Sequence, residues 1–306
     1  MKKNQTFILV ATLLTFITFS SCHNQQPAQP DNSFTFAFLT DIHIQPEMHA
    51  VEGFRQAIDA VNKLRPDFVI TGGDLVRDAL GQTRGRADSL YQLYKEETSR
   101  FTMPVYNTMG NHEVFGWYLK HGVSPETPDF GKKMFEKNLG KRYYSFEHKG
   151  WKFFILDDID SLDQAYYGHI SADQISWLTG ELAKTDTLMP LVVVAHIPFI
   201  TAQAQFHNGG LAANSRGGVI ENGREVLDLF NHHNLKLVLQ GHLHIYEDIF
   251  THNKHFITGG AVCGGWWSGP HDGTQEGFLL VKAQGDSVSA QYIDDGWEPV
   301  KAPAVE

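Results

Sequence analysis

The sequence predicts an α/β domain, in which strands and helices alternate along the chain. Three short apolar segments of β type each end in a polar loop, and helical patterns separate them. This alternation is typical of βαβ units, whose ligand sites lie at the carboxyl ends of the strands. At 306 residues with 42% hydrophobic content, the chain is long enough to bury a large core.

The first half of the chain supplies three predicted strands and two predicted helices. Residues 34–39 are a β-type run, and residues 67–70 and 104–106 are two further short apolar runs. Between the first two runs, apolar residues recur at helical spacing, namely Phe54, Ala57, Ile58, Val61 and Leu64. Pro66 ends this helix. A second helix with a polar face covers about residues 87–101.

The second half predicts a hairpin, a further pair of buried strands and a closing hairpin. Residues 143–146 and 151–156 flank a Gly-containing turn. Ser171 to Gln174 is a capping box that opens a helix with Ile175, Leu178 and Leu182 on one face. The remaining predicted elements are a strand at 191–194, a helix near 224–231, a strand at 237–239, and a hairpin of 277–283 with 287–293. No internal repeat or second-domain linker is evident.

The amino terminus has the pattern of a targeting segment. A basic start is followed by an apolar run over residues 7–19 and then by Ser20-Ser21-Cys22, the order of a secretory signal. The position of Cys22 resembles a bacterial lipoprotein signal. Residues 1–21 are then the signal peptide, residues 22–32 a flexible tether and residues 33–306 the domain. Phe19 departs from the strictest form of the signal, so simple cleavage or an uncleaved anchor stays open.

This pattern predicts an exported protein, a periplasmic or cell-surface lipoprotein of a bacterium held to the membrane by a lipid on Cys22. The formal charge of −10 and the pI near 5.9 argue against a broad nucleic-acid-binding surface. They do not exclude a phosphate substrate, because bound metal ions reverse the local field. With Cys22 lipidated, Cys263 has no disulfide partner and is expected to be a small buried residue.

Five of the apolar runs end in residue types that bind metals. The strand ends carry Asp41-x-His43, Gly73-Asp74, Gly110-Asn111-His112-Glu113, His196 and Gly241-His242-x-His244. Alternate side chains on an extended segment share a face, so a His-x-His pair can present two donors together. Mixed Asp, Asn and His donors suit borderline divalent metals rather than calcium or a thiolate site. The set is too large for one ordinary ion.

The order of these motifs resembles the calcineurin-like metallophosphoesterase superfamily over residues 41–244. The resemblance implies a four-layer α/β/β/α sandwich of two mixed sheets flanked by helices, with a dinuclear metal site at the strand ends. It implies two divalent or transition metal ions, such as manganese, iron or zinc. By family position, Asp41, His43, Asp74 and His244 hold one ion, and Asp74, Asn111, His196 and His242 hold the other. His112 is then the catalytic imidazole rather than a ligand.

The resemblance also implies metal-dependent hydrolysis of a phosphate ester, either a phosphomonoester or a phosphodiester, by a metal-bridging hydroxide. Two divalent ions, the carboxylates of Asp41 and Asp74, and the hydroxide leave a net charge of about +1, which attracts anionic phosphate within an acidic protein. His112 assists the leaving group by donating a proton or a charged hydrogen bond. A non-catalytic periplasmic or surface binding lipoprotein that keeps the fold is the alternative.

Several residues depart from the family pattern or extend it. Arg77 stands where purple acid phosphatases of the superfamily carry a tyrosine ligand, so a tyrosinate-to-iron colour is not expected. Asp78 is either a carboxylate that orients His112 or a solvent-facing acid. Glu113 is expected to support the site. The overall layout resembles the cyclic-nucleotide-phosphodiesterase-like branch of exported bacterial proteins.

Two loops remain open in function. Trp266 and Trp267 lie in a Gly-rich loop and are either a stacking surface for a base, sugar or aryl group, or core packing for the final hairpin. The long loop of residues 206–222 is a candidate rim of the pocket. Its polar side chains, for each of which surface solvation is favoured, are His207, Asn208, Asn214 and Arg216.

Overall fold

The computed structural model describes residues 32–118, 123–163 and 165–300. The predicted signal peptide, Cys22 and all of the tether except Asn32 lie outside the described residues, so the lipid anchor and the exported location stay predictions. Among the described helices, none combines the length and the apolar content needed to cross a membrane.

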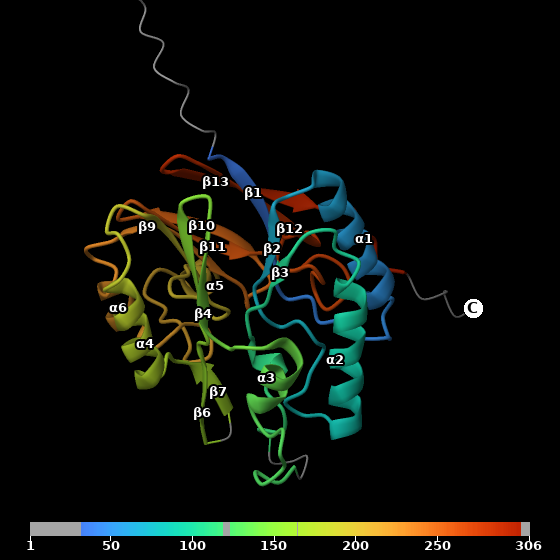
Figure 1. Ribbon diagram of the computed structural model, residues 1–306. Helices are drawn as coiled ribbons and strands as arrows, with labels where there is room; N and C mark the ends of the chain where they lie inside the picture. The colour runs from blue at the N-terminus through green and yellow to red at the C-terminus, as the bar shows by residue number, and fades with distance from the viewer. Residues whose placement is uncertain (1–31, 119–122, 164, 301–306) are drawn as a thin grey trace, which may run out of the picture. The chain divides into compact units, whose positions relative to one another are not determined.

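A five-stranded mixed sheet forms one half of the domain (Figure 1). Its strands, in spatial order, are β13 (Ser287–Asp294), β12 (Gly277–Gln284), β1 (Phe34–Leu39), β2 (Phe68–Thr71) and β3 (Val105–Tyr106). β1, β2 and β3 run parallel, and the closing hairpin of β12 and β13 adds antiparallel to β1. The three parallel strands therefore end at the same edge, where ligand sites form in such sheets.

A six-stranded mixed sheet forms the other half. Its strands, in spatial order, are β10 (Tyr246–Thr251), β11 (Lys254–Gly259), β9 (Asn234–Gln240), β8 (Pro190–Val194), β5 (Trp151–Ile155) and β4 (Tyr144–His148). β5, β8, β9 and β11 are parallel to one another. A separate hairpin consists of β6 (Ile159–Leu162) and β7 (Ala165–Gly168).

The two sheets pack face to face through an aromatic layer. Phe36 of β1 stacks on Phe68 of β2, with ring centroids 5.1 Å apart. Both rings meet Phe153 of β5 edge-on, at 5.5 and 5.4 Å. Because successive side chains of a strand point to opposite faces, Ala37 and Leu39 of β1 pack instead on the outer side of their sheet.

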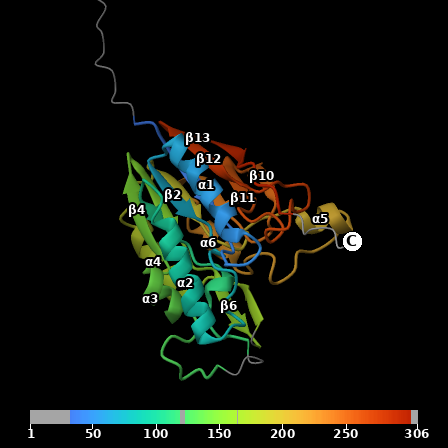
Figure 2. The same cartoon turned by 90° about the vertical axis from the view of Figure 1, so that its right-hand side faces the viewer.

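Helices cover the two outer faces and complete four layers, which confirms the predicted α/β/β/α sandwich (Figure 1). The described α-helices are α1 (Ala50–Leu64), α2 (Arg84–Thr98), α3 (Lys133–Leu139), α4 (Ala172–Leu182), α5 (Gln203–Asn208) and α6 (Gly223–Asp228), and a 3-10 helix, η1, spans Asn111–Glu113. Figure 2 shows α1 and α2 side by side on the outside of the five-stranded sheet. On the other sheet, Trp177 of α4 contacts Phe154 of β5, with ring centroids 6.3 Å apart.

Some predicted boundaries were wrong for local reasons. The helix predicted from residue 87 begins at Arg84, because the Thr83 side chain accepts a hydrogen bond from the N–H of Arg86 and caps it. At α4, Ser171 does cap the N–H of Gln174. The Gln174 side chain, however, exchanges two hydrogen bonds with the backbone of Asp157, so only half of the predicted capping box forms.

Candidate metal centre

The five polar strand ends meet at one place between the two sheets. They follow β1, β2, β3, β8 and β9, and they bring together all seven predicted ligands. The side chains of Asp41, His43, Asn111 and His196 are fully buried. Charged and polar side chains that are buried in this way need compensating partners.

Five of the seven predicted ligands have backbones in the left-handed region. Their φ angles are 54° for Asp41, 44° for His43, 52° for Asp74, 71° for His242 and 57° for His244. Residues with a β-carbon rarely adopt this conformation, and such strain clusters at functional sites. Tight backbone hydrogen bonds hold it here, including His43 N–H to Asp74 O at 2.9 Å and Asp41 N–H to Gly73 O at 3.0 Å.

Asp74 lies at the centre of the cluster. Its Oδ2 atom is 3.5 Å from His43 Nε2 on one side and 3.2 Å from His196 Nε2 on the other. Beyond His43, the Nε2 atom of His244 is 3.2 Å from His43 Nε2 and 3.4 Å from Asp41 Oδ1. One carboxylate therefore joins two groups of donors.

The second group forms around His196. Its Nε2 atom is 3.2 Å from Asn111 Oδ1 and 3.3 Å from His242 Nδ1. Potential donor atoms of Asp74, His196 and His242 all lie within 4.8 Å of one another. The distances therefore define two groups of potential donors that share Asp74, and the assignment of these residues as metal ligands stays a prediction.

The hydrogen bonds of two histidines determine which ring nitrogen faces the cluster. His196 Nδ1 is 2.8 Å from Gly72 O, and His244 Nδ1 is 2.6 Å from Gly264 O. A carbonyl oxygen only accepts, so each Nδ1 must carry the proton. In the neutral ring, each Nε2 then presents a lone pair to the cluster, where it faces other acceptors such as Asp74 Oδ2. Lone pairs that converge in this way are stabilised by a cation, so the residues fit metal ions.

The pKa values follow from burial and from the Asp74 charge. Burial alone would raise the pKa of Asp74, but His196 and His112 lower it well below its usual value. Burial alone would lower the pKa of His196, but the Asp74 carboxylate raises it to about 10. Burial lowers the pKa of His242 to about 3. An ion that binds here therefore takes the place of a proton on His196.

Glu113 secures the loop that carries Asp74. Its carboxylate accepts the backbone N–H groups of Asp74 at 2.9 Å and Leu75 at 2.7 Å. It also accepts those of Val76 at 3.0 Å and Gly110 at 2.7 Å. Burial raises the pKa of Glu113 to about 8, and these N–H donors oppose the rise by stabilising the charged form. Glu113 therefore supports the site by holding the backbone of the Asp74 loop, a contact that the motif did not specify.

His112 lies at the open side of the cluster and is half-buried. Its backbone N–H donates to Asp74 Oδ1 at 2.9 Å, and its Nε2 atom is 3.9 Å from Asp74 Oδ2. Its Nδ1 atom is 3.6 Å from Asp78 Oδ1, beyond hydrogen-bond length. Of the two interpretations of Asp78, the structure favours the carboxylate beside the imidazole over the purely solvent-facing acid.

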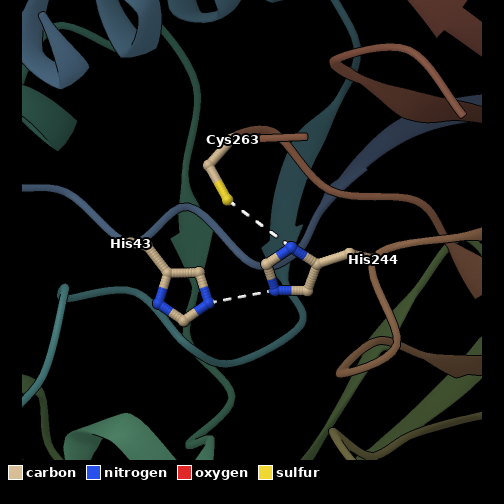
Figure 3. Close-up of side chains that lie close together, drawn as sticks. All are labelled: His43, His244 and Cys263. Carbon is tan, nitrogen blue, oxygen red and sulfur yellow. Dashed lines mark hydrogen bonds between the residues drawn. The ribbon is translucent and has the colours of Figure 1, made fainter. Parts of the chain in front are cut away.

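Cys263 lies behind His244 (Figure 3). Its Sγ atom is 3.7 Å from His244 Nδ1, the nitrogen that bonds to Gly264 O, whereas His244 Nε2 faces His43. Cys263 is fully buried, as predicted, and burial raises the pKa of its thiol well above the usual value. The thiol lies on the Nδ1 side of the His244 ring, and potential metal-binding atoms of His43, His244 and Cys263 lie within 4.8 Å of one another.

The two adjacent tryptophans have different environments. Trp267 is 1% exposed and donates from Nε1 to His43 O at 3.2 Å, so it belongs to the core. Trp266 is half-buried, and its ring centroid lies 3.9 Å from that of His43. Of the two interpretations from sequence, core packing therefore applies to Trp267 and a place in the site to Trp266.

The long loop contributes no side chain to the cluster among the residues predicted there. His207 pairs with Asp272 at 2.7 Å on the surface, and Arg216 pairs with Glu221. Sequence reasoning missed Tyr166, whose ring lies edge-on to His242 at a centroid distance of 5.7 Å. Tyr166 comes from the β6–β7 hairpin, which has no clear alternating pattern and was not predicted.

Comparison with known proteins identifies the family of the chain and agrees with its fold. The sequence profile of the calcineurin-like phosphoesterase family matches residues 34–246. A 3',5'-cyclic-nucleotide phosphodiesterase from Nostoc sp. is 23% identical over 239 residues, which are 75% of this chain and 78% of that protein. The chain belongs to the calcineurin-like phosphoesterase family, and as a metallophosphoesterase it is a phosphoric ester hydrolase.

Two solved structures share the fold at low sequence identity. A dimetal phosphatase from Danio rerio superposes with a TM-score of 0.59 at 14% identity, over 86% of this chain and 99% of that one. A purple acid phosphatase from yellow lupin superposes with a TM-score of 0.54 at 16% identity, over 86% of this chain and 52% of that one. These matches confirm the predicted fold class.

Proposed function

We propose that this protein hydrolyses phosphate esters with two metal ions held by the seven strand-end residues. Asp41, His43, Asp74 and His244 would hold one ion, and Asp74, Asn111, His196 and His242 the other. The observation that carries the proposal is the position of Asp74 Oδ2, which lies between the Nε2 atoms of His43 and His196 at 3.5 and 3.2 Å. A carboxylate shared by two donor groups is the feature that a dinuclear site requires.

When bound, the ions would supply an activated water and electrostatic stabilisation of the phosphoryl oxygens. The protein's own residues do the rest. Asp41 and Asp74 hold the only formal negative charges among the seven ligands, so a site with two divalent ions keeps positive charge and attracts an anionic ester. Mixed nitrogen and oxygen donors suit manganese, iron or zinc.

His112 is proposed to donate a proton to the leaving group. Its imidazole stands beside Asp74 without bonding to it through the ring, and it stays half-buried at the open side of the cluster. Asp78, 3.6 Å from Nδ1, would orient the ring so that Nε2 donates to the leaving group. His112 is thus free to act while the seven donors are engaged.

The alternative of a non-catalytic binding lipoprotein is less well supported. A binding protein that only retained the fold would have no need of a complete donor set with an additional imidazole beside it. Here all seven donors and His112 lie together, in loops whose backbone is strained to place them.

The test is hydrolysis of an aryl phosphate and a bis-aryl phosphate by the metal-loaded protein, with chelation and metal add-back. His112→Ala should keep its metal content and lose about 10²- to 10⁴-fold in kcat, the contribution of a general acid. His232→Ala, at an exposed histidine that is not one of the seven proposed ligands, is the matched control and should match the wild type. Undiminished turnover by His112→Ala would remove His112 from the mechanism. Absence of metal-dependent turnover of either ester by fully loaded wild type would favour the binding protein.

A further inference from the structure

Trp266 forms a wall against three of the site histidines. Its ring centroid is 3.9 Å from that of His43, 5.2 Å from His244 and 5.3 Å from His112. Its φ angle is 60°, an uncommon value for a bulky residue. The loop is therefore bent so as to hold this indole beside the site, although Trp266 contributes no metal donor.

The guanidinium of Arg77 lies over the indole ring of Trp266. Its Cζ atom is 4.1 Å from the Trp266 ring centroid, within cation–π distance. Arg77 follows Asp74 by three residues, and its backbone N–H bonds to Ile44 O at 3.0 Å, so the loop that carries Asp74 also positions Arg77. The side chain is half-buried.

The guanidinium of Arg77 has no acidic partner. Within the described residues, no carboxylate forms an ion pair with it and no acceptor receives its side-chain N–H groups, although the chain carries 35 acidic residues. The contact that holds the guanidinium is its stacking on Trp266, the indole that also lies against the site histidines. A guanidinium offers a planar fork of N–H donors that matches the geometry of phosphate oxygens. Stacking on Trp266 orients that fork without using up its donors.

We propose that Arg77, stacked on Trp266, binds the non-reacting oxygens of the substrate phosphate. This contact favours dianionic phosphomonoesters over monoanionic phosphodiesters, and it rests on the proposed function. The charge of the site supports this preference. Two divalent ions against the carboxylates of Asp41 and Asp74 already leave the site positive, and Arg77 adds one further positive charge. A dianion gains more from this added charge than a monoanion does, because the Coulomb energy scales with the product of the charges.

The first test measures binding rather than turnover. Calorimetric titration of the metal-loaded protein with inorganic phosphate should show about tenfold weaker binding by Arg77→Met, as expected for loss of charged hydrogen bonds. Arg77→Lys keeps the charge but loses the fork, and should fall between the wild type and Arg77→Met. Arg224→Met removes an arginine whose side chain is 86% exposed on α6, and should bind phosphate as the wild type does.

The second test compares an aryl phosphate with a bis-aryl phosphate. Arg77→Met should lower kcat/KM about tenfold for the monoester and by less than about threefold for the diester, at unchanged metal content. Equal losses on both esters, loss of metal from the variant, or wild-type phosphate binding by Arg77→Met or Arg77→Lys would each overturn the proposal. If Arg77→Met does not fold, Arg77→Lys decides the question by the same titration. A wild type that binds phosphate but hydrolyses neither ester would refute the proposed function alone, since the titration still measures Arg77.

Discussion

Replacing Glu113 by glutamine tests how the loop that carries Asp74 is held. Each oxygen of the Glu113 carboxylate accepts two backbone N–H groups. Oε1 accepts from Leu75 and Val76, and Oε2 accepts from Asp74 and Gly110. Glutamine keeps one acceptor oxygen and replaces the other with an NH₂ group. Whichever way the amide turns, two buried N–H donors then face another donor.

The expected cost follows from that count. A buried N–H left without an acceptor costs about 1–3 kcal/mol, so two of them cost about 2–6 kcal/mol. We expect Glu113→Gln to lower the free energy of unfolding by about 4 kcal/mol, a large part of the roughly 5–15 kcal/mol of a typical domain. Metal affinity should fall about tenfold, because Asp74 loses its support.

Urea unfolding followed by circular dichroism, at a fixed metal concentration, measures the first quantity, and metal titration measures the second. Glu96→Gln, on the exposed side of α2, makes the same chemical change without the buried donors. It should alter the free energy of unfolding by less than about 0.5 kcal/mol. If Glu113→Gln were as stable as Glu96→Gln, the four N–H bonds would not be what holds the loop.

Two further predictions concern residues outside the seven proposed ligands, namely the ion pair of a buried glutamate and two helix glycines. Hydrogen bonds from Arg55 lower the pKa of Glu97, which is 1% exposed, so its stabilisation is present above the unfolded pKa of about 4.3 and is lost as the pH falls through the lower folded pKa. Glu97→Gln should lower the free energy of unfolding by about 1.5–3 kcal/mol at pH 7. On acidification, the free energy of unfolding of this variant should fall less than that of the wild type. Urea unfolding at several pH values measures this, and an equal fall in both proteins would contradict the prediction. Gly53→Ala on α1 would place a methyl group into the Trp267 indole and should lower the free energy of unfolding by about 1–3 kcal/mol, whereas Gly180→Ala on α4 meets open space and should raise it by about 0.5–1 kcal/mol. Thermal unfolding of the two variants with the same sign of change would refute the packing argument.

The sequence predicts the layers of this fold better than the boundaries of its elements. Apolar runs such as residues 191–194 and 237–239 are buried on both faces, and their positions emerge from composition alone. The β6–β7 hairpin is different. Its strands Ile159–Leu162 and Ala165–Gly168 mix polar and apolar residues without a clean alternation. They pair with each other, and Gly168 forms an isolated bridge to Ile220. Where tertiary placement rather than local pattern decides the structure, single-sequence reasoning has no signal to use.

The seven donors could be predicted because each follows a predicted strand and belongs to a residue type that binds metals. The structure confirms that they come together, whereas their binding of metal stays a proposal. The role of Glu113 could not be predicted in detail, because its four partners are backbone N–H groups that no side-chain pattern reveals. Trp266 and Trp267 are neighbours of identical type. Only the left-handed turn at both residues, with φ angles of 60° and 65°, sends one to the site and the other to the core.

The strained backbone and the network of hydrogen bonds are two parts of one arrangement. Five of the proposed ligands adopt positive φ angles, and each such residue costs about 1 kcal/mol or more. Local structure alone would relax this strain and let the donors separate, all the more because their lone pairs face one another. The bonds to Glu113, the bonds of His196 and His244 to backbone carbonyls, and the parallel strands behind them oppose that relaxation. The donors are therefore held in place by the fold itself, so an arriving ion meets ligands that are already oriented and loses little of its binding energy in ordering them.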